Sequence, residues 1–299
     1  MLSDEFDSRA GIAAPAWTQA ELQRLLDVQP CGAGRYRAPA HGPTARDVVE
    51  AGQMLGDAVV AAAKHVPRQR VTSASMIFSR AAAHTAPLDI EVDALRSGRT
   101  FTTAQVTIRQ HDAPRCAGIV LLDSGAPDLI RSAAPIPRVD PPHRLRPLAI
   151  PGAEVDGRDM RVVDDAYDPD PNRVGPPELF VWTRFRDAPE HDYLHAALLT
   201  QSSTHWTVAA ALRPHAGFGE AMAHRSISTG ITMATITFHD DVDVTRWLLY
   251  ATRVTYAGRG HAQSEGQVYT EDGAVVASYS VHAMVRGLEP RATTADTLL

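Results

Sequence analysis

Cysteine is scarce in this sequence of 299 residues. Its two cysteines, Cys31 and Cys116, lie far apart and form no CxxC pair. They support neither a disulfide framework nor a structural zinc site, because both need several cysteines at characteristic spacings. Long apolar runs are missing as well. Stretches such as residues 207–212 are far shorter than the ~20 residues that span a bilayer, so we expect no membrane span.

An excess of positive charge is also lacking. The formal net charge is −6, which offers no basic field for nucleic acid, so we expect no nucleic-acid partner. The absence of a Gly-x-Ser-x-Gly elbow, a Walker motif and a Rossmann glycine signature excludes the commoner serine hydrolases, nucleotide hydrolases and dehydrogenases. Residues 1–7 are acidic where a secretory signal would be basic and then apolar, which favours a cytoplasmic protein.

A repeat organises what the sequence does contain. Residues 73–118 align without a gap on residues 233–278, an offset of 160. Turn residues fall on turn residues, as Gly98-Arg99 does on Gly258-Arg259, and apolar alternation falls on apolar alternation. The repeat predicts two copies of one β-rich unit, with a single cleft between them.

A helical pattern lies near the start of each copy. Apolar residues recur at spacings of three and four across residues 44–66, after which Pro67 ends the pattern. Residues 44–47 resemble a capping box. Gly52 lies inside this helix, at a cost of about 1 kcal/mol relative to alanine, which indicates close approach of another backbone or a ligand. In the second copy, residues 193–212 predict a long apolar helix.

Alternating residues and turn signals define the strands. We expect them at residues 73–80, 89–95, 100–111 and 115–123 in the first copy, and at residues 178–185, 226–239, 247–256, 260–270 and 274–286 in the second. Residues 125–177 contain 11 of the 21 prolines, which is typical of a linker. The predicted organisation is an N-terminal unit (1–125), a Pro-rich linker (126–177), a C-terminal unit (178–288) and a flexible tail (289–299).

With this order of elements, the chain resembles the type II acyl-CoA thioesterases from about residue 51 to residue 286. The resemblance is carried by Ala51-Gly52-Gln53-Met54-Leu55, by residues 95–101, by His191-Asp192-Tyr193-Leu194 and by residues 269–278. It implies an α+β fold of the double hot-dog type, in which two tandem units each wrap a curved antiparallel sheet around a long helix. It also implies hydrolysis of acyl-CoA to a fatty acid and CoA within fatty acid metabolism, no bound cofactor, and a homo-oligomer.

The family's catalytic set is changed in this sequence. In the family, an Asp on the second helix, a Thr on the next strand and a Gln on the last strand hold a water against the thioester carbonyl. The Asp position falls here on Thr200 or Gln201, the Thr position on Ile231 and the Gln position on Val281.

A shift of one residue would bring Thr232 and His282 to the two strand positions, although such a slip turns a strand side chain to the opposite face. The candidate catalytic residues are therefore Gln201, Thr232 and His282. An amide such as Gln201 can orient a water but cannot act as a base near neutral pH. His205 lies four positions further on and could supply the base on the same helix face, as could His282 on the last strand.

Each candidate also has a structural interpretation. Gln201 could be a helix cap or a satisfied interior amide, Thr232 a residue chosen for its strand propensity, and His282 a side chain on the outer face of its strand. The candidate substrate-binding residues are Gly52, Gln53 and His205.

Calcium is the one metal that a motif suggests. Asp168, Asp170 and Asn172 have the first spacings of a calcium loop, but Arg173 occupies the required glycine position and Leu179 the final acidic one, so we expect no metal.

Two functions therefore stay open. The first is an acyl-CoA thioesterase whose altered water-activating site lies in the cleft between the two hot-dog units. The alternative is a catalytically depleted acyl-thioester-binding or lipid-binding protein, because the apolar Ile231 and Val281 would dry the site.

Overall fold

The computed structural model describes residues 17–39, 48–148, 155–168, 170–223 and 225–288. The strands are β1 (Trp17–Thr18), β2 (Gln29–Gly32), β3 (Arg35–Ala38), β4 (Arg70–Phe78), β5 (Leu88–Ser97), β6 (Phe101–Gln110), β7 (Ala113–Asp123), β8 (Val155–Asp156), β9 (Arg158–Val162), β10 (Glu178–Phe185), β11 (Ile227–Phe238), β12 (Leu248–Gly258), β13 (His261–Thr270) and β14 (Val275–Gly287). The helices are α1 (Gln19–Leu26), α2 (Ala51–His65), α3 (Asp192–Ser203) and α4 (Thr207–Leu212).

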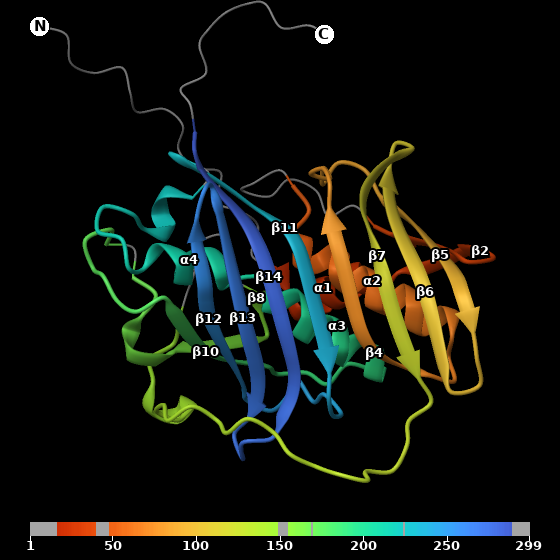
Figure 1. Ribbon diagram of the computed structural model, residues 1–299. Coiled ribbons are helices and arrows are strands. Elements are labelled where there is room, and N and C mark those ends of the chain that lie inside the picture. Colours follow the sequence, from red (N-terminus) through yellow and green to blue (C-terminus); the bar gives the residue numbers. More distant parts are fainter. Residues whose placement is uncertain (1–16, 40–47, 149–154, 169, 224, 289–299) are drawn as a thin grey trace, which may run out of the picture.

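Twelve of these strands form one sheet, in the order β2-β3-β5-β6-β7-β4-β11-β14-β13-β12-β10-β9. The four α-helices cover one face of this sheet (Figure 1). The opposite face, called the open side below, carries none of them, but the Pro-rich segment packs on part of it around Trp182. The predicted strands of both copies are present, with bounds shifted by a few residues. The first predicted helix begins at Ala51 and takes Glu50 as its N-cap, while the predicted capping box at 44–47 lies outside the described residues.

The second predicted helix is divided in two, because α3 ends at Ser203 and α4 begins at Thr207. Three hydroxyl groups at the end of α3 donate to carbonyl oxygens three or four residues earlier, from Ser202, Ser203 and Thr204. Such bonds compete with the backbone ladder and bend helices. The break places His205 in the turn between the two helices.

A single antiparallel seam, between β4 and β11, joins the two halves of the sheet. At its centre Ser75 pairs with Thr235, and their hydroxyl groups form a 2.8 Å hydrogen bond. The two residues are 160 positions apart, the offset of the repeat, so each is the counterpart of the other and an internal two-fold axis passes between them. Each seam strand also has a bulge, at Thr72 in β4 and at the equivalent Thr232 in β11. The predicted double hot-dog is confirmed.

Helices α2 and α3 pack closely side by side in opposite directions. A Cβ on Gly52 would overlap the carbonyl oxygen of Gln201, and one on Gly56 would lie 3.2 Å from that of Ala197 and 2.8 Å from Leu26 Cδ2. The close approach expected at Gly52 is therefore that of a second helix backbone. The two glycines, which have no side chain, allow the helices of the two units to lie this close together.

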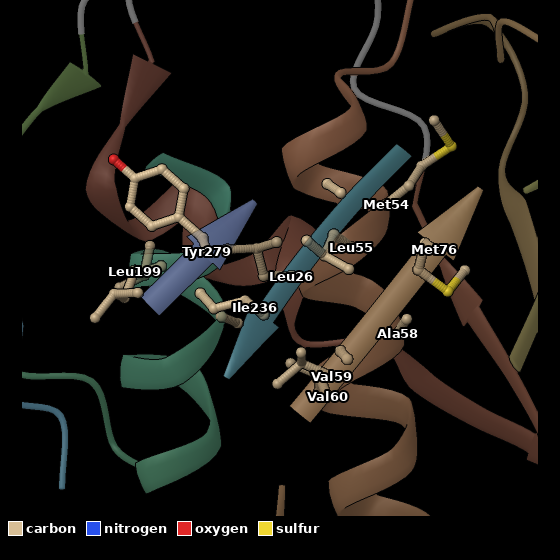
Figure 2. Close-up of a cluster of buried hydrophobic side chains, with 14 of the residues drawn as sticks. Leu26, Met54, Leu55, Ala58, Val59, Val60, Met76, Leu199, Ile236 and Tyr279 are labelled. Carbon is tan, nitrogen blue, oxygen red and sulfur yellow. The ribbon is translucent and has the colours of Figure 1, made fainter. Parts of the chain in front are cut away.

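The buried core continues beneath the seam. Leu55 and Ala58 on α2 are fully buried, as are Met76 on β4 and Ile236 on β11 (Figure 2). Because Met76 and Ile236 come from different halves of the sheet, the one helix packs under both. Burying a side chain of this size contributes about 1.5–3 kcal/mol.

The Pro-rich segment adds structure to the second unit. Strand β9 pairs with β10 and forms the edge of the sheet. Trp182 on β10 donates from Nε1 to the carbonyl oxygen of Asp140 and is packed against Ile136, Val139 and Leu145. The limits of the units stay a prediction, but this segment covers and extends the second half-sheet. No helix in the described residues has the length and apolar character to cross a bilayer.

Replacing Gly52 with alanine should destabilise the fold by roughly 1–3 kcal/mol, because the added methyl group meets the backbone of α3. The midpoint of urea-induced unfolding measures the effect. Gly230→Ala is the matched control, since a Cβ there meets nothing within 4 Å. An unchanged midpoint for Gly52→Ala would contradict the close packing of the two helices.

Candidate active site

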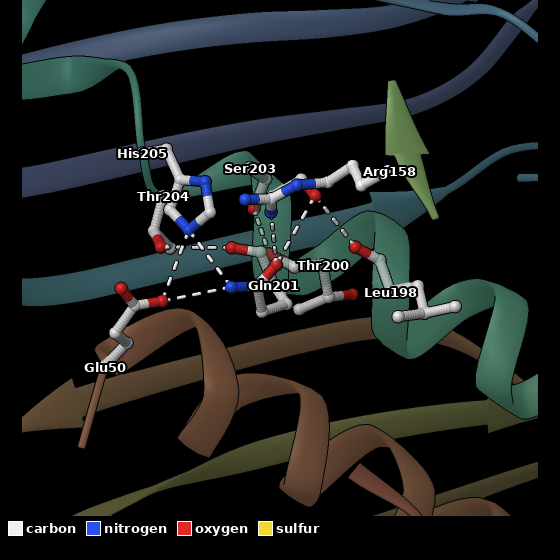
Figure 3. A network of polar contacts seen from close by, with 9 residues as sticks. Glu50, Arg158, Leu198, Thr200, Gln201, Ser203, Thr204 and His205 are labelled. Atoms are coloured by element: carbon white, nitrogen blue, oxygen red, sulfur yellow. Dashed lines mark hydrogen bonds and ion pairs between the residues drawn. The ribbon is translucent and has the colours of Figure 1, made fainter. Parts of the chain in front are cut away.

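A cluster of polar side chains lies where α2 begins and α3 ends. Glu50, the N-cap of α2, does not cap its own helix with its side chain. Gln201 donates instead from Nε2 to Glu50 Oε2 at 3.0 Å, and His205 Nε2 lies 3.3 Å from the same oxygen (Figure 3). The Gln201 and His205 Nε2 atoms are 3.1 Å apart. A carboxylate, an amide and an imidazole thus meet at one point.

Arg158 approaches this cluster from the edge strand β9. Its Nη1 donates to Gln201 Oε1 at 3.4 Å, and Ser202 Oγ, which donates to the carbonyl oxygen of Leu198, lies 3.5 Å from the same atom. The amide is oriented so that its oxygen faces the cation and its NH₂ faces the carboxylate. Burial lowers the pKa of the Arg158 guanidinium, and the nearby Glu50 carboxylate partly offsets that effect.

The cluster is open to solvent at one side. The Glu50 side chain is 39% exposed and that of His205 is 17% exposed, whereas Gln201 and Arg158 are buried. The first N–H groups of α2 donate no hydrogen bond to the side chain of the N-cap residue. A helix N-terminus carries partial positive charge and free donors, so this end of α2 suits a polar group that develops negative charge.

Thr232 and His282 contact each other, but away from the cluster of Glu50, Gln201 and His205. Thr232 Oγ1 hydrogen-bonds to His282 Nδ1 and to the carbonyl oxygen of His282, and the His282 ring stacks on that of His261 with centroids 4.9 Å apart. Along β14, Val281 and Ala283 are fully buried, so the alternating His282 faces the open side of the sheet. The contacts of Gln201 described above include neither residue. Their catalytic role stays a prediction.

The bulge at Thr232 explains this arrangement. It allows Ile231 to pair with Ala283 while Met233 pairs with His282. Ile231 packs against the main core and Val281 is fully buried, so the two family positions face the helices with apolar side chains. The slip that would turn Thr232 and His282 inward is absent.

The remaining predicted residues lie along α2 and in the Pro-rich segment. Gln53 is buried in the first turn, next to Gly52 at the contact with α3. Asp168 pairs with Arg173, at 2.6 Å between Nη1 and Oδ2. In the described ranges, no group of three or more His, Cys, Asp or Glu side chains is arranged to hold a metal ion.

Two residues of the cluster were not predicted from the sequence. Glu50 directly precedes the Ala51-Gly52-Gln53 stretch that carries the family resemblance, and its position at the start of a helix was an available signal. Arg158 lies in the segment interpreted as a linker, 43 residues before Gln201. No local pattern marks it, because only the pairing of β9 with β10 places it at the site.

One further charged residue is enclosed in α2. Asp57 is fully buried, and in the described part of the chain neither of its carboxylate oxygens has a hydrogen-bond partner. Burial raises its pKa well above the ordinary value. Burial also raises the pKa of the Cys116 thiol, and Asp57 adds to that effect. The raised pKa favours the protonated, neutral form of Asp57 in the folded protein.

Comparison with known proteins agrees with the fold and the sequence pattern. Family models described as the acyl-CoA thioesterase N-terminal and C-terminal domains match residues 39–122 and 132–285. Human acyl-coenzyme A thioesterase 8 is 23% identical over 288 residues, which cover 88% of each chain. The mouse protein of the same name is 24% identical over 297 residues, with 89% of each chain covered.

The similar solved structures share the fold. An acyl-CoA thioesterase II from Mycobacterium marinum has a TM-score of 0.74 at 24% identity, covering 89% of this chain and 98% of that one. A hot-dog protein from Alicyclobacillus acidocaldarius has a TM-score of 0.72 at 18% identity, covering 89% and 97%. The fold and site thus define a double hot-dog protein with a polar cluster between its two helices. The chain belongs to the acyl-CoA thioesterase family.

Asp57→Asn should change how stability depends on pH. The folded state binds the Asp57 proton more tightly than the unfolded state, where the pKa is about 3.9. Its contribution is therefore fully present below pH ~4 and is lost as the pH rises through the folded pKa. Asparagine does not titrate, so the variant should gain stability relative to the parent between pH 4 and pH 8. Urea unfolding midpoints across this range test the prediction, with the exposed Asp93→Asn as the control; a constant difference would contradict it.

Proposed function

We propose that this chain hydrolyses acyl-CoA to a free fatty acid and CoA, and that the reaction takes place at Glu50, Gln201, His205 and Arg158. The observation that carries the proposal is the meeting of a solvent-accessible carboxylate with an oriented amide and an imidazole, at the N-terminus of α2. Membership of the acyl-CoA thioesterase family supplies the substrate class.

Glu50 is the proposed general base. Gln201 and His205 hold its Oε2, which fixes the carboxylate in one direction and leaves the group accessible to water. The carboxylate takes a proton from a water molecule while the water oxygen bonds to the carbonyl carbon of the thioester. General-base catalysis of this kind contributes about 10²–10⁴-fold in rate.

The carbonyl oxygen becomes negative in this step. The N-terminal N–H groups of α2 are suited to stabilise it, since an electrostatic site needs donors aimed where charge develops. The tetrahedral intermediate then collapses. Its oxyanion re-forms the carbonyl, the carbon–sulfur bond breaks, and Glu50 returns its proton to the leaving thiolate of CoA.

Arg158 acts through Gln201 in this scheme. The guanidinium holds the amide oxygen, and the amide NH₂ holds the carboxylate. Its buried positive charge also favours the negative charge on Glu50. Arg158 is thus a positioning residue.

The binding-only alternative is less favoured. Its sequence argument was the apolar character of Ile231 and Val281, both of which line the inside of the sheet. The polar groups of the site come from the helix ends and from β9 instead, so apolar strands do not remove them. Absence of turnover with retained acyl-CoA binding would favour the alternative.

Assembly and location belong to the same proposal. We expect a homo-oligomer, by the family resemblance, in the cytoplasm and in fatty acid metabolism. Analytical ultracentrifugation at micromolar concentration that shows only single chains would contradict the oligomer.

Glu50→Gln should lower kcat for dodecanoyl-CoA by at least about 100-fold, because the amide keeps the shape of the side chain but cannot take a proton. Thiol release measured spectrophotometrically gives kcat and KM, and KM should change little. His282→Ala should stay within about twofold of the parent, since its side chain faces the open side of the sheet.

Glu265→Gln is the matched control, as Glu265 is an exposed carboxylate on β13. Full activity of the Glu50→Gln variant would show that Glu50 is not the general base. A large loss of kcat in His282→Ala would indicate that the reaction takes place on the open side of the sheet, where Thr232 and His282 are paired.

A further inference from the structure

A large groove opens at the opposite end of the helix pair, where α2 ends and α3 begins. Its volume is about 990 Å³, and its walls come from both units. Lys64 lies in the last turn of α2, and Arg68 comes after that helix. Tyr193 lies in the first turn of α3. Phe238 is the last residue of β11, and Asp241 follows it. Pockets that hold small molecules typically measure about 300–1,000 Å³.

This groove is separate from the Glu50 cluster. Glu50 precedes α2 and Lys64 is in its last turn, so the two ends are about 20 Å apart at 1.5 Å per residue. Between them, Gly56 brings α2 against the backbone of α3, and the neighbouring Leu55 and Ala58 are fully buried. None of the residues of the Glu50 cluster is among the residues that line the groove.

The internal two-fold axis relates the two places. It passes between Ser75 and Thr235 and exchanges the first unit with the second. The start of α2 beside the end of α3 is the Glu50 cluster, and its counterpart is the start of α3 beside the end of α2. Lys64 Nζ lies 5.5 Å from the centroid of the Tyr193 ring, which places the groove at that counterpart.

The floor and the mouth of the groove differ in character. The floor is apolar and includes Val59, Ala63, Val71 and Phe238. Such a surface suits a hydrocarbon chain, at about 25 cal/mol per Å² of apolar area removed from water.

Four carboxylates line the groove, those of Asp123, Asp192, Asp240 and Asp241, and two of them have a cation nearby. Asp241 lies 3.7 Å from Arg70, Asp240 pairs with Arg131, and Lys64 pairs with Asp27 at 2.7 Å. Asp192 lies in the first turn of α3, where a carboxylate interacts favourably with the helix dipole. Of the described cations that line the groove, Lys64 and Arg70 take part in these ion pairs, and Arg68 is an exposed guanidinium.

We propose that this groove binds a fatty acyl chain with an anionic end, at a site separate from the Glu50 cluster. The acyl chain lies on the apolar floor of the groove, and Arg68 pairs with the anionic end of the ligand. The anion is the carboxylate of a free fatty acid or a phosphate of an acyl-CoA. The proposal rests on the walls of the groove and is independent of the catalytic role proposed for Glu50.

The test uses calorimetric titration of the Glu50→Gln protein with dodecanoate, dodecanoyl-CoA and CoA alone, so that turnover does not consume the thioester. Arg68→Glu should weaken acyl-chain binding about tenfold or more, because it reverses the charge at the mouth. Ala63→Trp should abolish it by filling the floor. Arg96→Glu, an exposed arginine on β5 away from the groove, should leave it unchanged.

Binding of dodecanoate that both groove variants weaken supports the proposal with a carboxylate ligand. Binding of dodecanoyl-CoA alone, with the same response, supports it with a phosphate ligand. CoA binding as tightly as dodecanoyl-CoA with the same response to the groove variants, or acyl-chain binding that responds to neither groove variant, would overturn it.

Turnover separates this proposal from the proposed function. With Glu50 intact, Ala63→Trp should keep its turnover of dodecanoyl-CoA. Loss of turnover in that variant would make the groove the substrate channel and would overturn a separate site. If the parent protein shows no turnover while groove binding responds as expected, the proposed function fails and the groove proposal stands.

Discussion

The antiparallel pairing of β4 with β11 is the constraint on which the rest of the structure depends. Because Ser75 meets Thr235 across this seam, two copies of one unit become a single sheet with an internal two-fold axis. The axis fixes the relation of α2 to α3, and Gly52 and Gly56 then let the two helices touch. Closely packed antiparallel helices have two equivalent ends, and each end combines the start of one helix with the finish of the other.

The two ends have diverged in opposite directions. At one end, the side chains of Glu50, His205 and Arg158 fill the space with polar contacts. At the other end, small and apolar residues such as Ala63 leave a groove. An internal repeat permits this division, since either copy can change while the shared seam maintains the fold.

Much of the fold could be predicted from the sequence, because strand alternation, turn residues and the offset of 160 are local or periodic signals. The division of the second helix was missed, since the apolar pattern continues across Thr204 while the hydroxyl groups end α3 there. The candidate site was predicted in part. Gln201 and His205 do meet, as their spacing of four predicted. The reason differs, since α3 ends at Ser203 and the following turn brings His205 to Gln201. Arg158 could not be found in this way, since its contact with Gln201, 43 residues later, depends on the pairing of β9 with β10.

The amide at position 201 follows from the carboxylate at position 50. Gln201 Nε2 lies 3.0 Å from Glu50 Oε2, so an aspartate or glutamate at 201 would bring two carboxylates into near contact. Like charges at that distance cannot both ionise at neutral pH, and one of the two would keep a proton and cease to be a base. The amide avoids this repulsion and donates to the carboxylate, while its oxygen accepts from the buried Arg158. An amide rather than an acid at position 201 is therefore consistent with a base supplied from the start of α2.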